Sequence, residues 1–289
     1  MKHKILAAAA ALLALSMTGC TREMMQLAGL TQKPKETKNY VETLQSDPGD
    51  ALTLELKNAT GCLDIQCGSG KKADIRVECK VEAGSQQVIE DCIAHMNVKA
   101  ESDNQVFRLC MTEKESGRDF DKWVQSNYGN AVSVSADFYV TLPKDICTYN
   151  IENGVGTIDI SNAEGVFNVQ NGVGDITLKN AVVQNDSQFK TNIGSVELSP
   201  KSVSGNTSVS SDTGNIRLTF ADKCTNEGSV SAKTAAGDIQ FDQGQNTYSV
   251  VSEQQSGLQQ TSTVKVADCC TVQMQTQAGS IRFIRGAAE

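Results

Sequence analysis

Catalysis by this chain would have to use very few histidines. The 289 residues contain two histidines, and His3 lies in the first few residues. A Ser-His-acid triad or a zinc site of mixed ligands would therefore depend on His95 alone. His95 stands beside Ile93 and Met96 with no nucleophile motif near it, so we expect a packed or surface side chain. The sequence predicts no metal site, no cofactor and no catalytic residue.

The ten cysteines are the other reactive group, and nine of them follow Cys20. The Cys-x2-Cys spacing of zinc ribbons is absent, Cys62 and Cys67 lie at opposite ends of one predicted strand, and Cys269 and Cys270 are adjacent. We expect most to be small apolar residues with free thiols, with about one or two disulfides. A thiol-based redox or metal-capture surface is the alternative. The nine are Cys62, Cys67, Cys79, Cys92, Cys110, Cys147, Cys224, Cys269 and Cys270.

The N-terminal segment predicts export and lipid attachment. Lys2, His3 and Lys4 precede an apolar run over 5–15, which is too short to span about 30 Å of hydrocarbon and is typical of a signal peptide. The following LSMTGC (15–20) resembles the lipobox of bacterial lipoproteins, in which Cys20 receives a diacylglycerol and, after cleavage, an acyl chain on its amino group. An ordinary cleaved signal peptide is the alternative. We expect a signal peptide over 1–19 and a flexible polar tether over 20–50.

Charge limits the partners of the mature chain. Cleavage before Cys20 leaves 270 residues and removes Lys2 and Lys4, which lowers the formal net charge from −8 to −10. Such an acidic chain disfavours nucleic acid and anionic headgroups as partners. Membrane attachment would therefore depend on the acyl chains.

A repeated phrase predicts the fold. Its copies are LELKNATGCLDI (54–65), YNIENGVGTIDI (149–160), FNVQNGVGDITL (167–178), SQFKTNIGSVEL (187–198), TSVSSDTGNIRL (207–218), VSAKTAAGDIQF (230–241) and VQMQTQAGSIRF (272–283). From Tyr149 onward the glycines are 18, 20, 20, 23 and 42 residues apart, and the last gap predicts a degenerate copy near Gly257. Periods near 20 residues are typical of solenoids. The glycines expected at the corners, where a positive φ is allowed, are Gly61, Gly156, Gly174, Gly194, Gly214, Gly237 and Gly279.

Columns of like residues indicate which side chains face the core. Three apolar columns, five residues before the glycine and two and four after it, all face one way. A column of small polar residues stands three before the glycine, where it can bond its own turn or the next coil. The first apolar column is Leu56, Ile151, Val169, Phe189, Val209, Ala232 and Met274. The polar column is Asn58, Asn153, Asn171, Thr191, Ser211, Thr234 and Thr276.

These columns favour an all-β fold, a right-handed parallel β-helix with coils of about 20 residues over 51–286. An antiparallel sandwich is the alternative, since it also uses short strands at regular spacing. A solenoid explains the columns better, because stacking coils place like residues on like residues.

Residues 82–130 interrupt the repeats, and we expect an inserted helix and loop region that covers one end of the coils. Apolar residues at helical spacing predict a helix over 85–96. Phe120, Trp123 and Tyr128 follow on a predicted loop. They are expected to plug this cap, with partner contact as the alternative.

Carboxylates on the outer face are the remaining candidates for chemistry, since glycan hydrolysis needs a carboxylate pair. Asp64 and Asp159 stand three residues after their glycines and would be neighbours if their coils stack. Charge along the rest of this column is mixed. The rest is Thr177, Glu197, Arg217, Gln240 and Arg282.

The repeats resemble a family of bacterial surface proteins that carry the label "putative adhesins", with Gly-x-Ile-x-Leu phrases on a β-helical domain. The resemblance runs from LTLELKNATGCLDI (52–65) through DFYVTLPKDICTYNIENG (137–154) to the last repeat. It implies the fold and a surface location, and it implies no catalytic residues. The cysteines and residues 82–130 depart from the family pattern.

We therefore expect a non-enzymatic lipoprotein that presents a β-solenoid as a binding or scaffolding surface in the cell envelope. It would be anchored outside the cytoplasmic membrane, or to an outer membrane where one exists, and bind a glycan or protein of the envelope. A β-helical glycan-processing enzyme and an envelope-stress sensor acting on a membrane partner are the alternatives.

Overall fold

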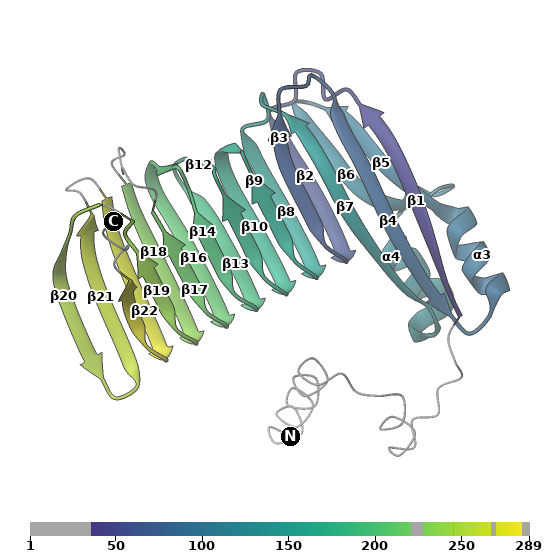
Figure 1. Cartoon of the computed structure of the whole chain (residues 1–289). Coiled ribbons are helices and arrows are strands. Elements are labelled where there is room, and N and C mark those ends of the chain that lie inside the picture. The colour runs from purple at the N-terminus through teal and green to yellow at the C-terminus, as the bar shows by residue number, and fades with distance from the viewer. Residues whose placement is uncertain (1–35, 221–227, 245, 267–269, 285–289) are drawn as a thin grey trace, which may run out of the picture.

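The computed structural model describes residues 36–220, 228–244, 246–266 and 270–284. They form two long β-sheets that face each other along a rod and enclose one core (Figure 1). Within the described residues sheet A has ten strands and sheet B has thirteen. The order in sheet A is β1 (Glu36–Ser46), β4 (Ala73–Ala83), β7 (Ser133–Pro143), β3 (Leu63–Gly68), β9 (Ile158–Ser161), β11 (Ile176–Lys179), β14 (Val196–Ser199), β17 (Ile216–Thr219), β19 (Ile239–Asp242) and β23 (Ile281–Ile284).

Sheet B follows the same rod. Its order is β20 (Tyr248–Ser256), β21 (Gln259–Val266), β22 (Cys270–Ala278), β18 (Gly228–Ala236), β16 (Gly205–Thr213), β13 (Ser187–Ile193), β10 (Glu164–Val173), β8 (Thr148–Val155), β2 (Thr53–Thr60), β6 (Val106–Glu113) and β5 (Met96–Asp103). The short strands β12 (Val182–Val183) and β15 (Ser202–Val203) lie off this path.

The predicted parallel solenoid is confirmed by the strand register. Neighbouring coils pair in parallel, with Val169 opposite Ile151 on one side and Phe189 on the other. The first apolar column is buried throughout, and the columns two and four residues after the glycine are buried except on β23, where Ile281 and Phe283 are half-buried. Stacked rings extend the core ladder, with ring centroids 4.7 Å apart for Tyr149 and Phe167. Parallel stacking places each residue on its equivalent and so aligns the columns.

Close backbone approach explains the corner glycines. A Cβ on Gly174 would lie 2.0 Å from the carbonyl oxygen of Gly156, and the φ of Gly174 is +128°. The same carbonyl accepts a hydrogen bond from Asn171 Nδ2 at 2.7 Å. Every later coil repeats this side-chain bond to the preceding glycine, from Thr191, Ser211, Thr234 and Thr276 at 2.8–2.9 Å. The polar column therefore bonds to the neighbouring coil, one of the two roles expected for it.

The first coils differ from the prediction. Residues 36–46, expected in the tether, form β1, which pairs antiparallel with β4. Its alternate residues Tyr40, Leu44 and Ser46 are half-buried, so the prediction of a tether as far as residue 50 is wrong for this strand. Residues 1–35, which hold the predicted signal peptide and the lipidation site Cys20, lie outside the described residues.

The insert contains more than the expected helix and loop. Helix α3 (Gln86–His95) confirms the predicted helix. The insert then adds β5 and β6 to sheet B, followed by α4 (Phe120–Tyr128) and a short 3-10 turn over Gly129–Ala131. Strand β6 pairs in parallel with β2, and β5 pairs antiparallel with β6. The insert therefore extends sheet B as well as capping its end.

The expected degenerate coil near Gly257 is absent from the described residues. β22 pairs directly with β18 and β23 with β19, so residues 270–284 form the next coil. The intervening β20 and β21 form an antiparallel hairpin beyond β22, with Gly257 in its turn. Polar residues such as Gln254, Gln255 and Gln260 suit this exposed hairpin better than a buried coil.

We predict that Gly174→Ala lowers the free energy of unfolding by about 3 kcal/mol, because the new Cβ strains the backbone and collides with the neighbouring coil. Gly84→Ala is the matched control, since no atom lies within 4 Å of its added Cβ; its effect should stay within about 0.5 kcal/mol. Urea unfolding followed by circular dichroism measures both. Equal effects of the two substitutions would contradict the corner role.

Candidate functional site

A cleft of about 370 Å³ lies between α4 and the coils. We call it the α4 cleft. Its lining comprises residues 57–60 of β2, Cys110 and Met111 of β6, residues 119–122 at the start of α4, Val134 and Ala136 of β7, and residues 152–154 of β8.

The cleft exists because β6 leaves β2 early. The two strands pair from Thr53 opposite Val106 as far as Lys57 opposite Cys110. Met111 and the residues after it continue to pair only with β5, and Thr112 bridges to Asp119 just before α4. On this edge the last three residues of β2 therefore have no neighbouring strand, and α4 lies across the gap.

The lining combines an apolar floor with a charged rim. Met111, Phe120, Val134 and Ala136 supply apolar surface, and Phe120 is almost fully buried. On the rim, Lys57 pairs with Glu152 at 3.2 Å and Lys122 with Asp119 at 2.6 Å. Asp121 makes no ion pair with a described residue.

An unused acceptor lies beside the cleft. Asn153 is buried, and its Nδ2 donates to the carbonyl oxygen of Gly61 at 3.0 Å. Its Oδ1 is buried and accepts no hydrogen bond from any described residue. Leaving such an oxygen unpaired costs about 1–3 kcal/mol. Asn171 Oδ1 in the next coil is likewise buried without a partner among the described residues, so this oxygen is a feature of the polar column. The cleft itself offers apolar contact and charges, which are recognition groups.

A tight turn before α4 is organised by Glu113. Its carboxylate accepts hydrogen bonds from Ser116 Oγ at 2.5 Å, from Ser116 N–H at 2.6 Å and from Glu115 N–H at 2.9 Å. These bonds favour the charged form and lower the pKa of Glu113 to about 2. This turn directly precedes residues 119–122, which line the cleft.

The predicted aromatic group lies on a helix, so its assignment to a loop is wrong. Trp123 packs between Phe120, at 5.6 Å between ring centroids, and Tyr128, at 5.8 Å. It also stacks on His95 of α3 at 4.7 Å, and the Tyr128 hydroxyl donates to Asp91 of α3. The group therefore joins the two helices of the cap, and the buried Phe120 is unavailable to a large partner. The apolar spacing of Phe120 and Val124 is the sequence signal that could have identified α4.

His95 is packed, as expected. Besides the stacking on Trp123, its Nδ1 lies 2.9 Å from the carbonyl oxygen of Asp91, and this contact raises the pKa of the imidazole. The ring contributes to the contact between the two helices.

Asp64 and Asp159 are neighbours on the outer face of sheet A. They stand directly opposite each other in the parallel pair of β3 and β9, and both are exposed. Tyr139 stands opposite Asp64 on the other side, with the Arg76 guanidinium 5.6 Å from the centre of its ring. The predicted adjacency of the two carboxylates is thus found, on an open sheet face.

Six cysteines in the described residues are free thiols, as expected for most of the set. Cys62 and Cys147 are exposed, Cys67, Cys79 and Cys92 are buried, and Cys110 is half-buried. Burial raises the pKa of Cys79 to about 12, with a further contribution from Glu42. Cys270 of β22 is buried, and Cys20, Cys224 and Cys269 lie outside the described residues. The buried thiols act as small core residues.

We predict that Glu113→Gln destabilises the protein at pH 7 and flattens its response to acid. The pKa of Glu113 is lower in the folded chain than in the unfolded one, so its contribution is complete above about pH 4.5 and is lost as the pH falls towards 2. Urea unfolding at pH 7, 4 and 2.5 should show the gap between wild type and variant closing. Glu115→Gln is the control, because its carboxylate accepts no hydrogen bond from a described residue. A gap that does not depend on pH would contradict the assignment.

Comparison with known proteins found similar solved structures and one matching family. Three solved structures similar to this chain bear the name "putative adhesin" or "putative cell adhesion protein". One from Bacteroides fragilis is 12% identical with a TM-score of 0.35, covering 85% of this chain and 97% of its own. One from Clostridium sporogenes is 11% identical with a TM-score of 0.26, covering 86% and 100%. One from Parabacteroides distasonis is 9% identical with a TM-score of 0.26, covering 85% and 97%.

No curated protein matches the chain. None of the described helices is long and apolar enough to cross a membrane. The family described as Toastrack DUF4097 matches residues 53–285, from β2 to the end of the last coil. This chain, with its coils stacked on corner glycines, belongs to the Toastrack DUF4097 family.

Proposed function

We propose that this protein is a non-enzymatic binding module of the cell envelope, anchored through acyl chains on Cys20, that receives an extended segment of an envelope protein in the α4 cleft. The unpaired end of β2 carries this proposal. An extended peptide that lies along a free strand edge gains main-chain hydrogen bonds, and neighbouring pockets select its side chains.

The lining suits such a segment. An apolar side chain of the segment would pack on Met111 and Val134, which line the cleft. The carboxylate of Asp121, which makes no ion pair with a described residue, favours a lysine or arginine in the partner. Because the surrounding coils are held by the corner ladder, the cleft needs little reorganisation on binding.

The lipid anchor agrees with the position of β1. Residues 21–35 separate Cys20 from the start of β1, a stretch that spans at most about 50 Å when extended. β1 lies at the same end of the rod as α3 (Figure 1). Anchoring would therefore hold the capped end nearer the membrane and direct the β20–β21 hairpin away from it.

Photo-crosslinking in cells tests the cleft. With a photoreactive amino acid at Thr60, which also lines the cleft, we expect a discrete protein adduct that falls at least about tenfold in an Ala59→Trp background, because the indole fills the cleft. Ala235→Trp is the matched control, since Ala235 holds the same position two residues before its corner glycine in a distant coil. An adduct that survives Ala59→Trp would contradict the site.

A glycan-processing enzyme is the second candidate, favoured by the adjacency of Asp64 and Asp159 beside Tyr139. Strands about 4.8 Å apart place two carboxylates near the separation used by retaining glycosidases. We expect the wild-type chain to release no sugar from cell-wall glycans. Product release that is abolished by Asp159→Asn and kept by Glu197→Gln, a change in the same column, would establish the enzyme instead.

A further inference from the structure

We propose that the end of the rod opposite the helices is a self-association surface through which two copies of this chain join tip to tip. We call this surface the tip. It is formed by β20, β21 and β23, and its exposed residues are Val250, Val251, Glu253, Leu258, Arg282 and Ile284.

The two sheets end at different levels at the tip. β22 and β23 belong to the last coil, and sheet A ends at β23. Sheet B continues for two more strands, β21 and β20 (Figure 1). Near the base of the hairpin Tyr248 stacks on Phe283 of β23, with ring centroids 5.7 Å apart. Towards its turn the hairpin has no strand of sheet A opposite it, and a space of about 290 Å³ lies between this part and Ile281.

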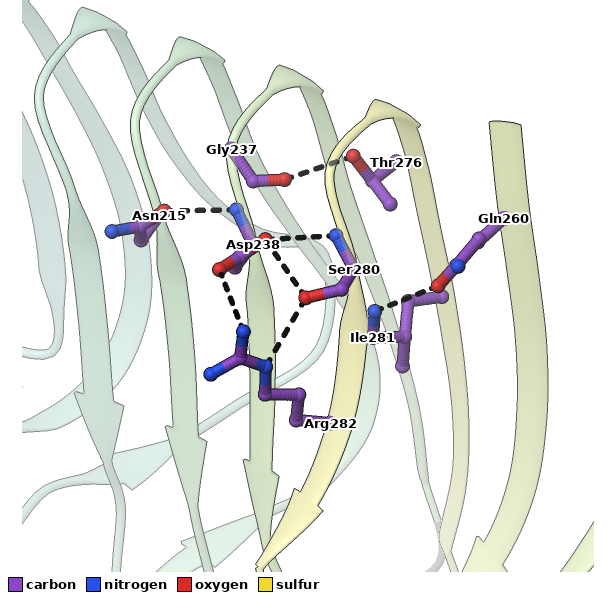
Figure 2. Close-up of polar contacts among 8 residues, drawn as sticks. All are labelled: Asn215, Gly237, Asp238, Gln260, Thr276, Ser280, Ile281 and Arg282. Carbon is purple, nitrogen blue, oxygen red and sulfur yellow. Dashed lines mark hydrogen bonds and ion pairs between the residues drawn. The ribbon is translucent and has the colours of Figure 1, made fainter. Parts of the chain in front are cut away.

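Within the described residues, a hydrogen bond completes only the first position of the free β23 edge. In earlier coils the residue two after the glycine donates its N–H to the next coil, as from Ile239 to the carbonyl oxygen of Ser280 at 2.9 Å. At the last coil, Ile281 N–H donates to Gln260 Oε1 at 2.9 Å, so a side chain replaces the missing backbone (Figure 2). The Ser262 hydroxyl, which lines the same space, is buried without a hydrogen-bond partner among the described residues.

The tip lacks the protection seen on the other edge strands. β5 carries Lys99, Glu101 and Asp103 along its exposed edge, and charges of this kind block edge pairing. β20 carries one charge, Glu253, in nine residues. Val250 is 48% exposed, and Val251, at the bulge in β20, is 64% exposed. Leu258 in the turn is 76% exposed, so burial of the tip would remove several large apolar side chains from water.

Charge favours a second copy in a tip-to-tip arrangement. Residues 36–143 contain 18 acidic and 11 basic residues, whereas residues 228–284 contain four acidic and three basic ones. The acidic surface is thus concentrated at the helical end, and contact through the tips keeps the two acidic ends far apart.

The tip is also complementary to itself in charge. The Arg282 side chain is 64% exposed and lies 3.8 Å from Asp238 (Figure 2). Glu253 makes no ion pair with a described residue. A two-fold axis that brings β20 of one copy against β23 of the other would pair Glu253 with Arg282 twice, the reciprocal pattern of an isologous interface.

Analytical ultracentrifugation of the unacylated chain from Thr21 to Glu289 tests the proposal, at concentrations up to about 100 µM. We expect a dimer whose dissociation constant rises at least about tenfold in Val251→Lys, because lysine blocks a free edge. Val41→Lys is the matched control, since Val41 is 53% exposed on β1 at the opposite end, and it should leave the dimer unchanged. Circular dichroism verifies the fold of each variant.

Charge exchange separates the proposed contact from general repulsion. Glu253→Arg should weaken the dimer, and the double variant Glu253→Arg with Arg282→Glu should restore it. A wild-type monomer at all concentrations would overturn the proposal. So would open-ended assemblies or equal sensitivity to Val41→Lys, which indicate head-to-tail contact, or a double variant no stronger than Glu253→Arg.

Discussion

The carbonyl groups of the corner glycines hold this solenoid together. In every described coil before the last, this carbonyl lies where a side chain on the next corner glycine would stand, and it accepts a hydrogen bond from the polar residue of the next coil. Glycine is needed at the corner because the carbonyl of the preceding coil occupies the space that a Cβ would fill. Asn, Thr or Ser suffices three residues earlier, because each of these side chains supplies a hydrogen-bond donor that reaches the same carbonyl. At the first coil no glycine precedes Gly61 in the stack, and the carbonyl of Ala136 on β7 takes the equivalent place. It accepts a hydrogen bond from Asn58 and lies where a Cβ on Gly61 would stand.

The stack of coils has two ends, and they differ in structure. At one end, antiparallel strands β1 and β4 extend sheet A, the β5–β6 hairpin extends sheet B, and α3 and α4 are joined by the stacking of Trp123 on His95. This cap does not continue the corner ladder, and the α4 cleft lies where β6 departs from it. At the other end, the β20–β21 hairpin lengthens only one sheet, which leaves a ledge beside β23. Both candidate binding surfaces thus lie where the repeat stops.

The chemically reactive side chains contribute to structure at several positions. Cys79 is a small apolar residue of the core, and its raised pKa is a consequence of burial. Cys67 Sγ lies 3.1 Å from the hydroxyl of Tyr149, at the start of the stacked aromatic ladder. The carboxylate of Glu113 organises the turn that precedes α4. Reactivity alone was therefore a poor guide to the site.

Sequence periodicity by itself determined the coils. The glycine spacing, the apolar columns and the polar residue three before each glycine predicted parallel stacking, because in-register coils make every contact local to one period. The sequence did not predict the ends of the rod. Strand β1, the departure of β6 from β2 and the hairpin around Gly257 depend on pairing between segments that do not repeat. Phe120 illustrates the difference: the sequence predicted a loop that plugs the cap, whereas the structure places this residue, buried, at the start of helix α4, and Trp123 of the same helix stacks on His95 of α3. Tertiary structure decided these elements because long-range contacts stabilise them. The coils were predictable because each repeat contains the residues that determine its own contacts with the next coil.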